Sequence, residues 1–82
     1  MNFKVIPCKV GGRWKIVADG IVRLDLGKVG KRFEVVVDGG IAVVVRDERG
    51  EFIVKKTGEI RFKSERSKEE CGKIADEVYG CG

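Results

Sequence analysis

Hydrophobic and polar residues alternate along most of the first 63 residues, in short segments separated by glycine-containing turn signals. Alternation with a period of two is typical of a strand that buries one face. The turn signals stand at 11–12, 19–20, 27–30, 38–40, 48–50 and 57–58. This spacing is typical of antiparallel hairpins, so we expect seven short strands connected as a meander between these six turns.

The two faces of these strands differ in chemistry. Every phenylalanine and the tryptophan fall on one face, which we predict to be the core. Its members are Phe3, Val5, Trp14, Ile16, Val22, Leu24, Leu26, Phe33, Val35, Val37, Ile41, Val43, Val45, Phe52, Val54, Ile60 and Phe62. The opposite face is mainly charged, with Ile6, Val17, Val36, Val44 and Ile53 among the charges. Because Pro7 lacks a backbone donor, we expect the first strand to lie at an edge of the sheet or to be bulged at Pro7.

A single helix is expected near the C-terminus. Ser67 and Glu70 have the spacing of a capping box, in which each side chain binds the other residue's backbone amide. The helix is then predicted over residues 68–79, with Gly80 as its C-cap. One apolar stripe recurs at helical spacing and is expected to lie on the sheet. It consists of Cys71, Ile74, Ala75 and Val78.

Element lengths restrict how this helix can cover the strands. About twelve helical residues span about 18 Å, whereas about seven strands side by side span about 30 Å. We therefore predict one α+β, mostly β domain over residues 1–82. In it, an antiparallel meander of about seven short strands curls and is packed by one C-terminal helix at about 67–79. Burial of uncovered strands against a second copy of the chain is an addition or an alternative to curling.

Composition indicates a folded domain outside the membrane. The 82 residues are 43% hydrophobic and 37% charged, which is typical of globular chains. The first ten residues lack the apolar core of a signal peptide, and no apolar run approaches the roughly 20 residues that span a bilayer. We therefore predict a cytoplasmic protein without membrane contact. The abundance of Lys, Glu, Arg and Val, with no Gln, resembles the bias of hyperthermophile proteins.

Three scattered cysteines, Cys8, Cys71 and Cys81, are considered for metal binding and cross-linking. Neither a CxxC pair nor a histidine accompanies them, which argues against a zinc site with its four nitrogen or sulfur ligands. We expect free thiols that serve as small buried apolar residues. A disulfide between Cys8 and Cys81 is the alternative, because Cys71 and Cys81 on one continuous helix stand about 15 Å apart, beyond disulfide reach.

The sequence contains few residues suited to catalysis. Without histidine, the commonest general base and the usual triads are missing. Asp47-Glu48 falls in a predicted turn, and Glu69-Glu70 falls in the first helical turn, where acids favour the helix dipole. No phosphate-binding glycine motif opens a helix after a strand. We therefore predict a protein that is not an enzyme and has no cofactor or metal.

Positive charge is concentrated at the start of the chain. Residues 1–32 contain eight basic and two acidic residues, residues 33–63 six of each, and residues 64–82 three basic and five acidic. Lys4, Arg13, Lys15 and Arg23 are expected on one strand face, where they could attract phosphate backbones without reading sequence. The aromatic residues, which stack on bases in many single-strand binders, are instead assigned to the core.

The segment from Phe52 to Tyr79 resembles the end of one half-repeat of the TATA-box-binding protein family. The resemblance lies in a strand ending at Lys56, the turn Thr57-Gly58, the strand Glu59 to Lys63, and Ser67-Lys68-Glu69-Glu70 opening the helix. The family's half-repeat also has an earlier helix and long strands ahead of this segment, where the present sequence predicts short hairpins. The family's DNA-facing sheet inserts phenylalanines into the minor groove, and no residue here is matched to those positions.

Seven meandering strands followed by a C-terminal helix are also the element order of pleckstrin-homology-like domains, which would suggest a module for phosphoinositides or peptides. Fold alone does not establish function. The leading hypothesis is a non-enzymatic domain that acts through its surface, as a homodimer or partner-binding module, because one helix leaves apolar strand face uncovered. The second hypothesis is weak, non-specific nucleic-acid binding through Lys4, Arg13, Lys15 and Arg23.

Overall fold

The structure, a computed structural model, is an α+β fold that is mostly β, as the sequence predicts. It describes residues 3–7 and 13–81. Six strands and two helices follow in the order β1 (Phe3–Pro7), β2 (Trp14–Ala18), α1 (Leu26–Arg32), β3 (Glu34–Asp38), β4 (Ala42–Asp47), β5 (Gly50–Lys55), β6 (Ile60–Phe62) and α2 (Lys68–Cys81). The prediction of about seven strands is one too many for the described residues.

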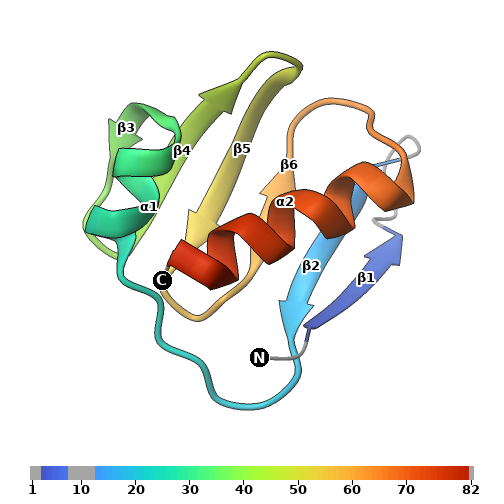
Figure 1. The fold of residues 1–82 in the computed structure, drawn as a ribbon, viewed down its shortest axis with the longest axis horizontal. Coiled ribbons are helices and arrows are strands. Elements are labelled where there is room, and N and C mark those ends of the chain that lie inside the picture. The colour runs from blue at the N-terminus through green and yellow to red at the C-terminus, as the bar shows by residue number, and fades with distance from the viewer. Residues whose placement is uncertain (1–2, 8–12, 82) are drawn as a thin grey trace.

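All six strands form one curled, open antiparallel sheet in the order β1-β2-β6-β5-β4-β3 (Figure 1). The strands β3 to β6 form a meander, whereas β2 pairs with the distant β6. Lys15 lies opposite Arg61, and Ile16 lies opposite Ile60 in that pair. The first strand is at an edge, as expected from Pro7. The other edge is β3.

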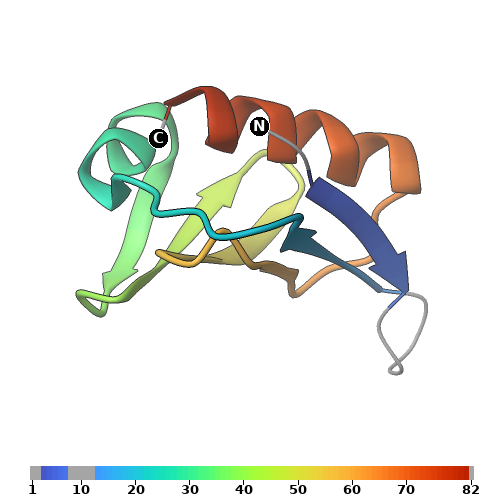
Figure 2. The same ribbon diagram turned by 90° about the horizontal axis from the view of Figure 1, so that it is seen from below.

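Both helices lie on the same face of the sheet (Figure 2). The longer α2 packs against β1 and β2, and the shorter α1 packs against β3, β4 and α2. The sheet is therefore covered by two helices rather than by one. Its opposite face carries no helix in the described part of the chain, and we call it the helix-free face.

The helix α1 replaces a predicted strand and turn. Residues 21–25 have no regular structure, and Leu26–Arg32 is helical. The side chain of Asp25 caps this helix by accepting hydrogen bonds from the amides of Gly27 and Lys28 at 3.0 and 3.3 Å. Leu26 and Val29, three residues apart, are buried. Two glycines lower the intrinsic helix propensity of this segment, so the cap and the burial of two side chains are what favour the helix here.

The core lies between the helices and the sheet. The buried hydrophobic residues of the described chain are Ile16, Leu24, Leu26, Val29, Val43, Val45, Phe52, Val54, Ile60, Phe62, Cys71, Ile74, Ala75, Val78 and Tyr79. Phe3, Val5, Trp14, Val22 and Phe33 pack against this cluster. The predicted apolar face is therefore mostly confirmed, including every Phe and the Trp, and so is the apolar stripe of α2.

Three residues assigned to the core are exposed instead. A register shift between Val35 and Val37 places Val37 opposite Val44, on the helix-free face. Val35 and Val37 are 41% and 54% exposed because β3 is an edge strand. Ile41 lies in the turn before β4 and is 77% exposed. A bulge turns the following side chains to the other face, and strict alternation cannot anticipate it.

The ends of α2 differ from the predicted caps. The hydroxyl of Ser67 accepts a hydrogen bond from the amide of Glu70 at 3.2 Å, which is one half of the capping box. The side chain of Glu70 binds Arg49 instead of closing the other half. Gly80 does not end the helix, which continues to Cys81. Gly80 does not have the positive φ of a glycine C-cap.

Candidate interaction surfaces

The helix-free face has an apolar centre. Residues directly opposite each other in an antiparallel pair share a face, so the pairs of Val37 with Val44 and of Val44 with Ile53 form a row across β3, β4 and β5. Val44 and Ile53 are partly exposed. Ile6 and Val17 occupy the same face of β1 and β2 and are also partly exposed.

One half of the helix-free face is basic. Lys4 and Lys15 lie on it, because Lys4 is opposite Val17 and Lys15 is opposite Ile6. Arg13 precedes β2 by one residue and is exposed. None of these three cations makes an ion pair with another described residue. Three of the four predicted contact residues are therefore gathered at the β1–β2 end of the molecule.

Arg61 is a neighbour of this patch that no local sequence signal indicates. Arg61 is opposite Lys15 across β2 and β6 and opposite Ile53 across β5 and β6, so it joins the basic half to the apolar centre. Its Nε lies 2.8 Å from Glu59, which also pairs with Lys55 at 3.2 Å. These cations lower the pKa of Glu59 despite the opposing effect of burial. The pairing of β2 with β6 is a long-range contact that alternation does not reveal.

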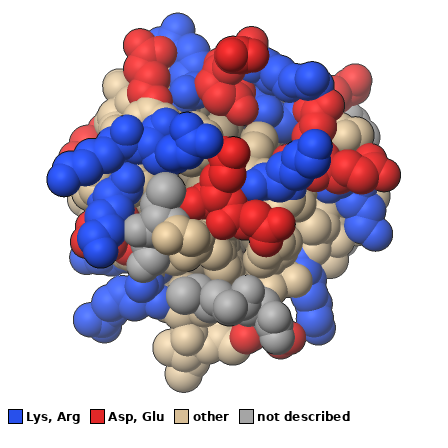
Figure 3. All heavy atoms as spheres, in the orientation of Figure 1, with Lys and Arg blue, Asp and Glu red and all other residues tan. Residues whose placement is uncertain are grey.

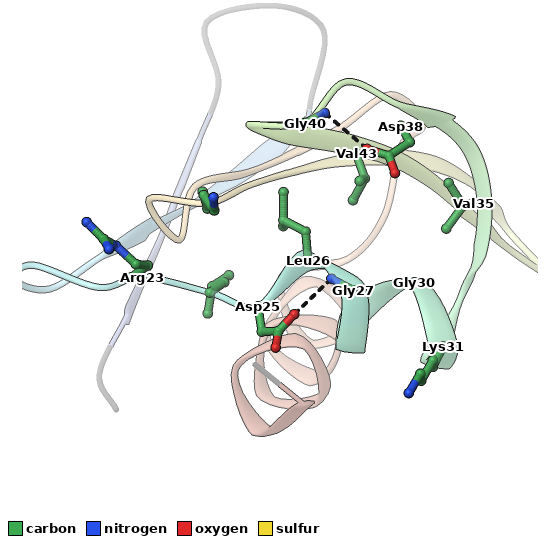
Figure 4. A pocket seen from close by; sticks show the side chains of 12 residues that line it. Arg23, Asp25, Leu26, Gly27, Gly30, Lys31, Val35, Asp38, Gly40 and Val43 are labelled. Atoms are coloured by element: carbon green, nitrogen blue, oxygen red, sulfur yellow. Dashed lines mark hydrogen bonds between the residues drawn. The ribbon is translucent and has the colours of Figure 1, made fainter.

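The fourth predicted contact residue, Arg23, is not on a strand. It lies in the segment between β2 and α1 and lines a cleft of about 820 Å³ between that segment, α1 and β3 (Figure 4). The expectation that it shares a strand face with the other three is wrong, because residues 21–25 cross from the sheet to the helix layer.

The carboxylates of this cleft are held by backbone amides. Asp25 caps α1, and Asp38 accepts a hydrogen bond from the amide of Gly40 at 3.0 Å (Figure 4). Both side chains stabilise local turns, as Asp commonly does. The cleft is open, and its charged side chains belong to exposed residues, including Lys31 and Lys56. These carboxylates are explained by local structure and do not indicate acid–base chemistry.

A buried arginine anchors the opposite end of the molecule. The side chain of Arg66 is 1% exposed and donates to both carboxylate oxygens of Asp47, at 2.9 and 2.6 Å, and to the carbonyl of Gly50 at 3.2 Å. Its guanidinium lies 5.5 Å from the ring centroids of both Phe52 and Phe62. Such bidentate pairs and cation–π contacts are strong when they are desolvated. Arg66 therefore fastens the segment before α2 to the β4–β5 turn.

This cluster sets the ionisation of Asp47. Burial alone raises the pKa of Asp47, but hydrogen bonds from Arg66 and from the amides of Arg49 and Gly50 lower the pKa below its ordinary value overall. The carboxylate is therefore held charged and bonded rather than prepared to accept a proton. Three buried polar atoms nearby have no protein partner: Ser64 Oγ, Arg66 Nε and Glu70 Oε2. Buried water commonly bonds such atoms.

The helix-bearing face has interspersed charges. Figure 3 shows lysine and arginine mixed with aspartate and glutamate across it. Arg32 pairs with Glu77 at 3.1 Å and links α1 to α2. Exposed pairs of this kind contribute little to stability. The described charged residues of this face are therefore of both signs.

The cysteines are only partly covered by the described residues. Cys71 is a free, buried thiol within α2, and burial raises its pKa. The predicted role of a small apolar residue is confirmed for Cys71. The alternative disulfide between Cys8 and Cys81 falls outside the described residues, since Cys8 and the side chain of Cys81 are not described. Within 3–7 and 13–81, no group of acidic and cysteine side chains has the arrangement of a metal site.

The described chain is thus a small α+β domain with a helix layer on one face of an open antiparallel sheet. No helix in its described part is long and apolar enough to cross a membrane. Comparisons with known proteins found no match for this chain among protein-family models, curated protein sequences or solved structures.

Proposed function

We propose that the protein is a non-enzymatic interaction module, which binds a second copy of itself or another protein through the helix-free face. The observation that supports this is the row Val37, Val44 and Ile53, which leaves branched aliphatic side chains partly exposed in the middle of a sheet. Contiguous exposed apolar surface commonly marks an interaction site. Moving a valine or isoleucine side chain from full exposure to full burial contributes about 1.5 to 3 kcal/mol, and covering these partly exposed side chains contributes a fraction of that.

Two valines of β3 provide a matched test of the proposed face. Val37 faces away from the helices and is 54% exposed, whereas Val35 lies opposite the buried Val45 and is 41% exposed. A lysine at position 37 would place a charge on the proposed surface, and a lysine at position 35 would place the same charge on the helix side. Both substitutions act at exposed positions of the same strand.

Sedimentation velocity from micromolar to millimolar protein is the measurement. We expect self-association that Val37→Lys weakens by at least tenfold, about 1.4 kcal/mol, and that Val35→Lys leaves within twofold of the wild type. A strictly monomeric wild-type chain excludes the homodimer form of the proposal. Equal effects of the two substitutions would contradict the assignment of binding to the helix-free face.

A second candidate, non-specific nucleic-acid binding, is supported by the basic half of the same face. Lys4 and Lys15 have no acidic partner among the described residues, and Lys15 lies directly opposite Arg61. Like charges at opposing positions destabilise a strand pair. Glu59 offsets part of the Arg61 charge, and a bound phosphate would relieve the remaining repulsion.

The aromatic residues limit what kind of nucleic-acid binding is expected. Every Phe and the Trp pack in or against the core, so they are not available on the helix-free face for base stacking or for insertion into a groove. Phosphate contacts alone give a dissociation constant of about 1 to 100 µM at physiological salt. With the four cations Lys4, Arg13, Lys15 and Arg61, the logarithm of the association constant should fall with the logarithm of salt at a slope of about −3 for a single strand.

Fluorescence anisotropy with a labelled single-stranded oligonucleotide tests this candidate. Lys4→Glu/Lys15→Glu should abolish binding at low salt. Lys28→Glu/Lys73→Glu changes the net charge by the same amount, with one substitution on each helix. This variant should retain most of the binding. Arg23→Glu is also expected to have little effect, because Arg23 lies off the strands. Absence of binding at low salt, or equal loss in both double variants, would remove this candidate.

A further inference from the structure

An apolar groove opens at one end of the helix-free face. It has a volume of about 560 Å³ and lies between the segment that leads to α1, the start of β4 and the β5–β6 turn. Its lining is Ile21, Val22, Arg23, Ile41, Ala42, Lys55, Lys56 and Thr57. Ala42 and Lys55 are opposite each other in the ladder and share the face of Val44, so the groove is continuous with the apolar centre. Its volume is in the range of about 300 to 1,000 Å³ that is typical of ligand sites.

The groove is held in shape by backbone hydrogen bonds between its three walls. The amide of Lys56 donates to the carbonyl of Ile41 at 3.0 Å, and the carbonyl of Lys56 accepts from the amide of Leu24 at 2.9 Å. Lys56 therefore ties the start of β4 to the segment before α1. A site that exists before binding avoids part of the cost of ordering its residues.

Two isoleucines border this groove and contribute nothing to the core. Ile21 is fully exposed and Ile41 is 77% exposed, and these are the two most exposed large hydrophobic residues of the described chain. A single exposed apolar residue needs no explanation, whereas two of them on the rim of an apolar groove form a patch that favours binding. A ligand that lay between them would remove their side chains from water.

The charge around the groove indicates the sign of the ligand. Arg23, Lys55 and Lys56 line it, and no carboxylate does. Lys55 pairs with Glu59, but Arg23 and Lys56 make no ion pair within residues 3–7 and 13–81. A second copy packed groove to groove would bring the same cations together, so electrostatic complementarity favours an acidic segment of a different partner at the groove itself.

We propose that this groove binds an extended peptide segment of a partner protein, in which an aliphatic side chain enters between Ile21 and Ile41 and a neighbouring carboxylate pairs with Arg23 and Lys56. The inference rests on the proposed function, since the groove is one end of the helix-free face, and it names the chemistry of the partner. A concave site between two isoleucines suits a peptide side chain better than the flat surface of a bilayer.

N-acetyl-leucine is a minimal probe, because it joins one aliphatic side chain to one carboxylate. Titration into the ¹⁵N-labelled full chain should shift amide signals of residues 21–23, 41–42 and 55–57 together, with millimolar affinity. N-acetyl-leucinamide, without the carboxylate, and N-acetyl-glycine, without the side chain, should each bind roughly tenfold more weakly. Absence of groove shifts with N-acetyl-leucine, or equal binding of all three probes, overturns the proposal.

Variants connect the signal to the groove. Ile41→Ser and Arg23→Gln/Lys56→Gln alter exposed side chains and should each weaken binding of N-acetyl-leucine by roughly fivefold or more. Lys28→Gln/Lys31→Gln, which removes the same charge from α1, should leave binding within twofold. Equal loss in the two double variants would show general charge attraction and not a site.

Two other occupants are outcomes that overturn the proposal. If the amide signals of the groove shift with protein concentration alone, and Ile41→Ser abolishes that shift, the groove binds a second copy. Binding to phosphatidylserine vesicles that is lost in Ile21→Ser, without a response to N-acetyl-leucine, assigns it to an anionic bilayer. Val37→Lys, which tests the proposed function, should not alter binding of the probe. A negative result for the groove proposal can therefore be distinguished from a negative result for the proposed function.

Discussion

The hydroxyl group of Tyr79 donates a 2.6 Å hydrogen bond to the backbone carbonyl of Gly58, and both residues are buried. This bond joins the last turns of α2 to the β5–β6 turn. The Tyr79 ring also meets Phe3 of β1 edge to face, with ring centroids 5.2 Å apart. One side chain thus connects the C-terminal helix to a central turn and to an edge strand.

Removal of the Tyr79 hydroxyl should destabilise the fold. Tyr79→Phe keeps the ring contacts but leaves the buried carbonyl of Gly58 without its partner, which costs about 1 to 3 kcal/mol. Urea unfolding followed by circular dichroism measures the difference. A change below a few tenths of a kcal/mol would mean that water reaches this carbonyl and replaces the phenol.

The same bond predicts a dependence on alkaline pH. Burial raises the pKa of Tyr79 in the folded chain, so its contribution is complete below the pKa of the unfolded chain, about 10. The contribution is lost as the pH rises through the higher folded pKa. The stability difference between the wild type and Tyr79→Phe should therefore shrink above about pH 10, which urea unfolding at a series of pH values tests.

A side chain at Gly58 should be strongly unfavourable. Gly58 has φ of +95°, and a Cβ atom there would lie 2.8 Å from the Tyr79 hydroxyl and 3.0 Å from Ala18 Cβ. Gly58→Ala should therefore cost about 3 kcal/mol, from backbone strain together with overpacking. Gly20→Ala is the control, because φ is +111° there and nothing lies within 4 Å; it should cost about 1 kcal/mol. Equal costs in urea unfolding would show that the contact with Tyr79 is unimportant.

The pair of buried Arg66 and partly exposed Asp47 should make stability depend on acidic pH. Asp47→Asn leaves the Arg66 charge buried without its counter-ion and should cost about 3 kcal/mol at neutral pH. Because the pKa of Asp47 is lowered on folding, the wild type has this contribution above the pKa of the unfolded chain, about 3.9. It loses the contribution as the pH falls through the lower folded pKa.

Unfolding of the wild type and Asp47→Asn from neutral to strongly acidic pH measures this effect. The gap between them should close at the acid end, and Asp47→Asn/Arg66→Met should regain part of the lost stability because no buried charge remains. A gap that stays constant with pH would contradict a role for the Asp47 charge.

The Cys71 thiol should react only when the chain unfolds. Its side chain is buried on α2, and burial raises its pKa, so little thiolate is present or accessible in the native state. Mass spectrometry after iodoacetamide treatment should show Cys71 unmodified natively and modified in urea. Rapid native modification would indicate local opening of α2. The same spectra without reductant would reveal a Cys8–Cys81 disulfide by its lower mass.

Local sequence predicted the elements in which the period of the hydrophobic residues matches the face that is buried. The alternation in Phe52–Val54 and Ile60–Phe62, and the stripe from Cys71 to Val78, each have a clear period, and these residues form much of the core. Lys4, Arg13 and Lys15 were recognised as one basic group for the same reason. Side-chain direction follows directly from the period of a regular element.

Long-range packing decided the rest. The segment with Val22, Leu24 and Leu26 alternates like a strand, yet the Asp25 cap and the burial of Leu26 and Val29 make its second part helical. The pairing of β2 with β6 brings Arg61 beside Lys15, and no local signal specifies partners so far apart in sequence. No local signal identifies Arg66, because only its tertiary position against the rings of Phe52 and Phe62 distinguishes it from a surface arginine.

The sequence by itself determined a small, mostly β domain with an aromatic core face, a C-terminal helix and a basic N-terminal region, because these depend on periodicity and composition. The tertiary structure alone decided that two helices, rather than one, pack on one face of the sheet. It also decided that the other face has an apolar centre beside Lys4 and Lys15, and that Ile21 and Ile41 border a groove. These features arise where distant segments meet, and burial there outweighs local preference.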